Sequence, residues 1–176
     1  MEWIGFYFQF LCERVLAEVM TIPGPKYGRA EFDGFLEVPW DFKAHATNTS
    51  QHNVIVNDLE AVEAAIAEYG AVGVILAVGN VQYNDDDRTF QRWHSALKGG
   101  KSKYELKRIE RGAWSRLRKV RFDLKQIVLI RLNRSTLSKC GSFQTAFRNA
   151  NGGSRRAKVL VDLEKVREDV IHFVEF

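Results

Sequence analysis

Residues 71–78, AVGVILAV, form an unbroken apolar run of eight residues. Such a run is typical of a β-strand that is buried on both faces. The residues before it predict a helix that begins at Asn57, with Glu60 in a capping-box position, and ends at Gly70. The apolar stripe of this helix comprises Leu59, Val62, Ile66 and Tyr69. A right-handed crossover through the helix would make 71–78 parallel to an earlier strand. We therefore predict an α/β fold in which helices flank a mixed sheet.

The composition fits one globular domain over residues 1–176. Of these residues 45% are hydrophobic and 12% aromatic, and the net charge is +4, values that argue against a disordered chain. Cys12 and Cys140 form no CxxC pair, so a zinc ribbon is not supported and a reducing compartment is expected. The N-terminal segment lacks a basic start, and no apolar stretch reaches the ~18 residues of a membrane span. We expect a soluble cytoplasmic protein.

Charge is distributed unevenly along the chain. Residues 1–97 contain six Lys/Arg and fourteen Asp/Glu, whereas residues 98–158 contain eighteen Lys/Arg and three Asp/Glu, a net charge of +15. A solvated charged surface is one interpretation of this basic segment. A polyanionic partner is favoured, because basic and aromatic residues alternate and few acids compensate the charge.

The remaining periodicities predict further elements, with no internal repeat. Helices are expected over 3–20, 85–97 and 104–121, extended strands over 26–50, 126–132 and 157–163, and a flexible basic loop over 149–156.

Asp33, Asp41 and Lys43 form the most informative chemical pattern. If a hairpin turns at Glu37, residues whose numbers sum to 74 face each other, which puts Asp33 opposite Asp41. Neighbouring carboxylates repel each other unless a cation neutralises them, and oxygen ligands without His or Cys suit Mg²⁺. Lys43 would share the face of Asp41, where its ammonium can orient water or stabilise charge on a phosphate. A surface ion pair on an edge strand is the structural alternative.

This pattern resembles the PD-(D/E)XK nuclease superfamily and, within it, the type II restriction endonucleases. The likeness rests on Asp33, on Asp41-Phe42-Lys43 in an alternating strand, on a preceding helix with Glu13 and Glu18, and on the helix and buried strand that follow. The resemblance covers residues 3–78 and implies a restriction-endonuclease-like αβββαβ core. Residues 80–163 would be a basic, DNA-binding elaboration with additional strands.

The resemblance also implies a catalytic site. Asp33 and Asp41 would bind Mg²⁺ together with the carbonyl of Phe42, and Lys43 would position the attacking water. A helical glutamate, Glu18 first and Glu13 second, would assist the metal. The reaction implied is phosphodiester hydrolysis that leaves a 5′-phosphate and a 3′-hydroxyl.

Several polar residues are candidates for contacts with DNA. His45 follows Lys43 on the same face and could contact the scissile phosphate, although a structural role is the more common one. Asn48 and Gln51 could read adenine edges or simply belong to a soluble loop. Basic residues that would track phosphates are Arg108, Arg111, Arg118, Lys119, Arg155 and Arg156.

The sequence therefore predicts a Mg²⁺-dependent endonuclease of double-stranded DNA, a type II restriction enzyme acting as a homodimer. A structure-selective nuclease, such as a Holliday-junction resolvase or repair nickase, is the enzymatic alternative. A non-catalytic nucleic-acid-binding protein, with the three ionisable residues as a salt-bridge cluster, is the other. No Gly-rich phosphate loop of either common type occurs.

Overall fold

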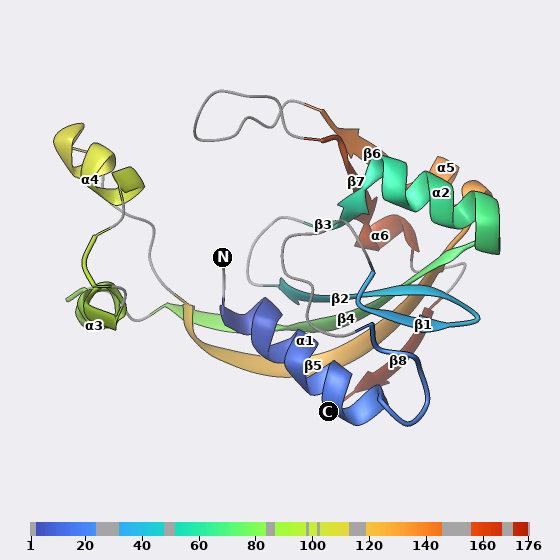
Figure 1. Cartoon of the computed structure of the whole chain (residues 1–176), viewed down its shortest axis with the longest axis horizontal. Helices are drawn as coiled ribbons and strands as arrows, with labels where there is room; N and C mark the ends of the chain where they lie inside the picture. Colours follow the sequence, from blue (N-terminus) through green and yellow to red (C-terminus); the bar gives the residue numbers. More distant parts are fainter. Residues whose placement is uncertain are drawn as a thin grey trace. The chain divides into compact units, whose positions relative to one another are not determined.

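The computed structural model (Figure 1) describes residues 3–23, 32–47, 52–83, 87–97, 99–101, 103–112, 119–145, 156–166 and 171–175. The chain divides into two compact units, one of Met1–Asn80 with Leu124–Phe176 and one of Val81–Asp123. The helices are α1 (Trp3–Leu16), α2 (Leu59–Tyr69), α3 (Thr89–Leu97), α4 (Lys103–Glu110), α5 (Arg134–Cys140) and α6 (Leu163–Val166). The strands are β1 (Gly34–Leu36), β2 (Val38–Ala46), β3 (Asn53–Asp58), β4 (Val72–Tyr83), β5 (Lys119–Leu132), β6 (Gly141–Gln144), β7 (Lys158–Asp162) and β8 (Ile171–Glu175).

The strands form two sheets. The larger has the order β1-β2-β4-β5-β8 and is mixed, because β1 and β2 are antiparallel whereas β2 and β4 are parallel. The smaller has the order β3-β7-β6 and is antiparallel. The predicted α/β class with a mixed sheet flanked by helices is confirmed. The order from α1 to β4 is the expected helix, three strands, helix and strand, but β3 belongs to the smaller sheet.

The main hydrophobic core lies on one face of β4. Val72, Val74, Leu76 and Val78 pack there with residues of α2, β5 and the smaller sheet. Successive residues of a strand point to opposite faces, so Ile75 and Ala77 are buried on the other side. Figure 1 shows α1 and α2 on different sides of the larger sheet, and α1 packs against β2. The continuous apolar run predicted a strand covered on both faces, and this is confirmed.

The hairpin between β1 and β2 has the predicted register. Gly34 pairs with Trp40 and Leu36 with Val38, which leaves Glu37 alone at the turn with a φ of 58°. The indole of Trp40 then covers Gly73 of the parallel neighbour, where any larger side chain would collide with the ring. The position of β2 between β1 and β4 is therefore fixed from both sides.

Several predicted boundaries are wrong for local reasons. The first helix ends at Leu16 instead of residue 20, because the backbone turns over the next three residues. The second begins at Leu59 with Asp58 as its N-cap, since Asn57 is the penultimate residue of β3.

The helix predicted over 104–121 ends at Glu110, and Gly112 follows with a left-handed φ of 64°. Residues 119–121 belong to β5 instead. The sequence did not predict α5, β6 or β8.

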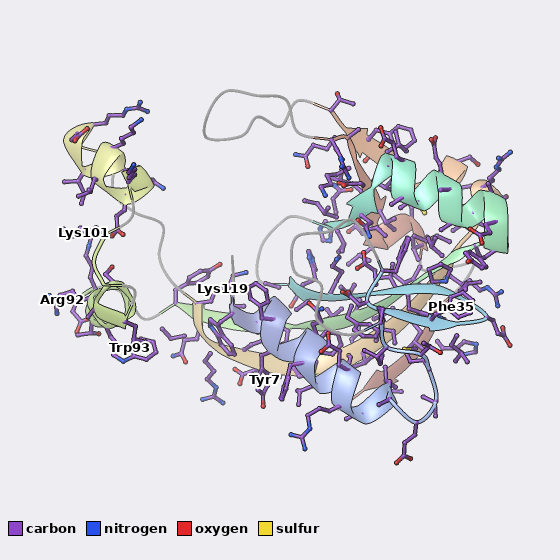
Figure 2. The ribbon with its side chains drawn as sticks, in the orientation of Figure 1. Tyr7, Phe35, Arg92, Trp93, Lys101 and Lys119 are labelled. Atoms are coloured by element: carbon purple, nitrogen blue, oxygen red, sulfur yellow. The ribbon has the colours of Figure 1, made fainter. Side chains whose placement is uncertain are left out.

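The unit Val81–Asp123 carries short helices and little buried surface. Within 87–97, 99–101 and 103–112, every residue whose side chain is described is exposed or half-buried. Arg92 and Trp93 stand on α3, and Lys101 lies between α3 and α4 (Figure 2). The basic loop predicted over 149–156 lies, up to residue 155, outside the described residues. In the described ranges, no helix has the length and apolar character needed to cross a membrane.

Candidate active site

The hairpin brings Asp33 next to β2. The backbone N–H of Asp33 donates to the carbonyl of Trp40 at 2.8 Å, in line with the antiparallel ladder. Its carboxylate oxygen Oδ2 accepts a hydrogen bond from the backbone N–H of Phe42 at 2.7 Å. The Asp33 carboxylate is thereby held beside β2, next to the backbone that carries Asp41 and Lys43.

Asp41 is buried almost completely, with 2% of its surface exposed. It lies beside Val74 in the parallel ladder, so it shares the face of the main core. The prediction that one side of β2 is ionisable is correct, but this side is packed instead of solvated. Its oxygen Oδ1 accepts from Nζ of Lys43 at 2.9 Å, whereas Oδ2 is buried without a hydrogen-bond partner in the described parts of the chain.

The electrostatics of Asp41 are those of a carboxylate with too little positive charge around it. Burial raises its pKa from 3.8 to about 7, and the ammonium of Lys43 opposes this rise only in part. The neighbouring carboxylate of Asp33 raises the pKa further. An added cation near Oδ2 would relieve both the burial cost and the repulsion.

Lys43 connects this buried carboxylate to the surface. Its side chain is 32% exposed while that of Asp41 is 3% exposed, so the ammonium stands between the core and solvent. His45 follows on the same face, half-buried and opposite Val78 in the ladder. The structure therefore brings Asp33, Asp41 and Lys43 together, with His45 next along the strand.

The helix α1 comes near the site through Cys12. Burial raises the pKa of the Cys12 thiol to about 12, and the negative charges of Asp33 and Glu13 contribute to this rise. Glu13 is half-buried and accepts a hydrogen bond from the amide of Gln9 at 3.0 Å. Sequence reasoning missed Gln9, which only its spacing of four from Glu13 could have indicated.

The structure places Glu18 elsewhere. This exposed residue follows α1 and lines a surface cavity of about 560 Å³ with the hairpin turn, Phe35–Glu37. No group of three or more His, Cys, Asp or Glu side chains able to hold a metal occurs within the described ranges. Neither Glu18 nor Glu13 therefore forms such a group with Asp33 and Asp41.

The residues that are present nevertheless fit Mg²⁺. One carboxylate just before β1 and one on β2 supply hard oxygen ligands, and the buried Oδ2 of Asp41 has no hydrogen-bond donor among the described residues. Magnesium commonly takes one or two protein carboxylates and fills its other positions with water and substrate phosphate. A third protein carboxylate is not required for such a site.

The predicted DNA-contacting residues are dispersed. Arg108 lies on α4, Arg111 in the turn after it, and Lys119 begins β5. Arg156 lies 3.4 Å from the carboxylate of Asp58, which also pairs with Lys158. Four of the predicted residues, Asn48, Gln51, Arg118 and Arg155, are outside the described residues.

The comparisons with known proteins add no relative. The chain matches no family model, and neither a curated protein nor a solved structure matches it with significant similarity.

Proposed function

We propose that this protein is a Mg²⁺-dependent endonuclease that hydrolyses phosphodiester bonds in double-stranded DNA. The observation that carries the proposal is the grouping of Asp33, Asp41 and Lys43, in which Oδ2 of Asp41 is buried with no hydrogen-bond donor among the described residues. A purely structural salt bridge would not need a second carboxylate beside a buried one, because this arrangement raises the free energy of the folded state. The resemblance to the PD-(D/E)XK superfamily assigns the same three residues to catalysis.

Each residue has a role that follows from its position. Asp33 and Asp41 would hold the cation, with Asp33 oriented by the N–H of Phe42. A bound Mg²⁺ would lower the pKa of a water molecule and neutralise phosphate charge. Lys43, which reaches solvent, would orient the water and stabilise charge on the phosphate. The water oxygen bonds to phosphorus as the bond to the 3′ oxygen breaks, and that oxygen leaves as a protonated hydroxyl.

The basic segment supports DNA as the substrate. Residues 98–158 carry a net charge of +15. Within Val81–Asp123, cations exposed to solvent include Arg92, Lys101, Lys103, Lys107 and Arg111. Exposed cations favour phosphate contacts and long-range attraction of a polyanion.

Incubation with DNA and Mg²⁺ tests the proposed function. Mixed-sequence linear duplex and a four-way junction of the same composition are the two substrates, and EDTA is the control. Discrete duplex fragments are expected for a sequence-specific restriction enzyme. Cutting confined to the junction would instead identify a structure-selective nuclease. Binding of both DNAs with no cleavage at any Mg²⁺ concentration would contradict the enzymatic proposal.

The proposed phosphate contacts predict a change in salt dependence. Replacing Arg111 by Ala should reduce the slope of log K against log salt by about 1, because one phosphate contact releases about one counterion. Fluorescence anisotropy of labelled duplex at several salt concentrations measures the slope. Lys165→Ala, an exposed cation paired with Asp162 outside the basic segment, is the matched control. An unchanged slope in Arg111→Ala would place α4 and its following turn away from phosphate.

A further inference from the structure

The helix α1 has two apolar faces, of which the sheet covers only one. Ile4, Phe8 and Cys12 recur at a spacing of four and form its buried face. A second stripe remains exposed to solvent and comprises Trp3, Phe6, Tyr7 and Phe10. Spacings of three and four residues place these side chains on one surface of the helix, and Tyr7 marks it in Figure 2. We call this stripe the outer face of α1.

The outer face exposes a substantial apolar area. Its four aromatic residues are 40% (Trp3), 40% (Phe6), 56% (Tyr7) and 52% (Phe10) exposed. Because a buried aromatic side chain covers 150–250 Å², these four leave roughly 300–500 Å² of apolar surface in water. Leu11, which is 37% exposed, lies at its edge. The largest apolar patch of a typical monomer is about 300–600 Å² and is often functional.

The low charge of the outer face indicates which kind of partner would bind it. Arg14, whose guanidinium carbon lies 5.7 Å from the centroid of the Phe10 ring, is a charged residue within this face, and Glu13 lies at its edge. A polyanion would require several cations, and a helix that lies on an anionic membrane carries Lys and Arg along its polar face. On α1, Gln9 and Glu13 lie between the two apolar faces. The chemistry fits another uncharged apolar surface.

The apolar area of the outer face favours a second copy of this chain as the partner. A standard interface buries about 800 Å² on each partner, and in homodimers about 65% of that area is apolar. The roughly 300–500 Å² of apolar surface on α1 is therefore most of the apolar area, about 500 Å², that each protomer of such a homodimer contributes. An apolar stripe is also complementary to itself, so a two-fold axis can pair it with its own copy and interlock the rings.

We infer that the outer face of α1 is the contact between two copies of this chain. Trp3 and Tyr7, whose ring centroids lie 6.3 Å apart, would pack with Phe6 and Phe10 of the second copy. The inference stands on the exposed face alone and does not depend on the proposed nuclease activity. A dimer would give one active site to each strand of a duplex, if the proposed function is correct.

Sedimentation velocity of the full chain without DNA or metal tests the inference. Wild type should sediment as a dimer at micromolar concentration, and Phe6→Glu/Phe10→Glu should raise the dissociation constant at least 100-fold. Phe143→Glu is the control, because Phe143 is 60% exposed on β6 and lies outside the face. Tyr7→Lys, at a position of the same face that is 56% exposed and so tolerates the change, should weaken the dimer even if the double variant misfolds.

Three results would overturn the inference. Wild type could sediment as a monomer up to about 100 µM, or Tyr7→Lys and the folded double variant could remain as dimeric as wild type. The third is a monomeric wild type that binds anionic vesicles through Phe6 and Phe10, which would assign the face to a lipid surface. Because no DNA is present, none of these results depends on whether the chain cleaves phosphodiesters.

Discussion

Two buried aspartates in this chain lie next to lysines but have opposite charge environments. Asp58 is 6% exposed and pairs with both Lys158 and Arg156. Asp41 is 2% exposed and has one lysine, Lys43, together with a second carboxylate. Two cations around Asp58 offset its negative charge, whereas a cation and an anion around Asp41 leave it uncompensated.

The difference separates a structural site from a candidate functional one. Asp58 ends β3 and is the N-cap of α2, and its cations come from β7 and the residues just before it. This ion cluster joins two strands and a helix. Asp41 stands in the middle of β2 and contributes no comparable link. A buried charged group that lowers stability, and that links no strands or helices in the described parts of the chain as Asp58 does, is a candidate for a role in function.

Cleavage activity should separate the two clusters most strongly. Replacing Lys43 by Met should lower the rate of Mg²⁺-dependent DNA cleavage by up to about 10³-fold, because it removes the positive charge next to the reacting phosphate. Lys158→Met should leave the rate per folded molecule within about two-fold of wild type. Nicking of supercoiled plasmid at matched concentrations of folded protein measures both. Equal losses in the two variants would mean that Lys43 acts only through stability.

The pH dependence of stability gives the next largest contrast. Because the pKa of Asp41 is raised from 3.8 to about 7, the folded chain binds this proton more tightly than the unfolded chain does. The residue therefore lowers stability as pH rises from about 4 to 7, and the full cost remains above pH 7. Asp41→Asn should match wild type near pH 4 and be more stable by up to roughly 4 kcal/mol at pH 8.

Urea denaturation across this pH range measures the effect. Asp123→Asn is the control, because Asp123 is an exposed carboxylate paired with Arg121 on the same strand. Its stability relative to wild type should not grow with pH. If Asp41→Asn were less stable than wild type at pH 8, the Asp41 carboxylate would be a stabilising partner of Lys43, as Asp58 is of its cations.

Removing Lys158 from the Asp58 cluster should lower the free energy of unfolding, whereas Asp41→Asn should raise it. Lys158→Met would leave Asp58 buried with only the more exposed Arg156 nearby. We expect a loss of about 3 kcal/mol, the low end of the range for breaking a buried pair, because Arg156 remains. Urea denaturation at pH 7 tests this, with Lys165→Met as the exposed control. A loss below 0.5 kcal/mol would show that the Asp58 cluster contributes little to the fold.

Local patterns predicted much of the site and less of the fold around it. The alternation along β2 and the apolar run of β4 reflect burial of neighbouring residues, and both gave correct elements. The turn at Glu37 was a separate hypothesis, and the register of β1 and β2 agrees with it. The burial of Asp41 was not predictable, because it depends on a second sheet that packs over this face.

Pairing between distant parts of the chain was not predicted. A third strand before α2 was expected, but β3 pairs with β7 about 100 residues later and so belongs to a second sheet. Helical spacing of Leu106 and Ile109 suggested a helix up to residue 121. The left-handed backbone at Gly112 and the strand that starts at Lys119 overrode this pattern. Glu18 was chosen from the length of the first helix, which ends too early for the residue to belong to it.

The most direct test of a cation site at Asp33 and Asp41 is a count of bound Mn²⁺ without DNA. Mn²⁺ prefers the same oxygen ligands as Mg²⁺, and the electron paramagnetic resonance signal of its free form measures binding. Wild type should bind one ion per chain, Asp33→Asn and Asp41→Asn should lose at least ten-fold in affinity, and Asp58→Asn should bind as wild type does. Unchanged binding in Asp41→Asn, or a loss confined to Asp58→Asn, would contradict the account.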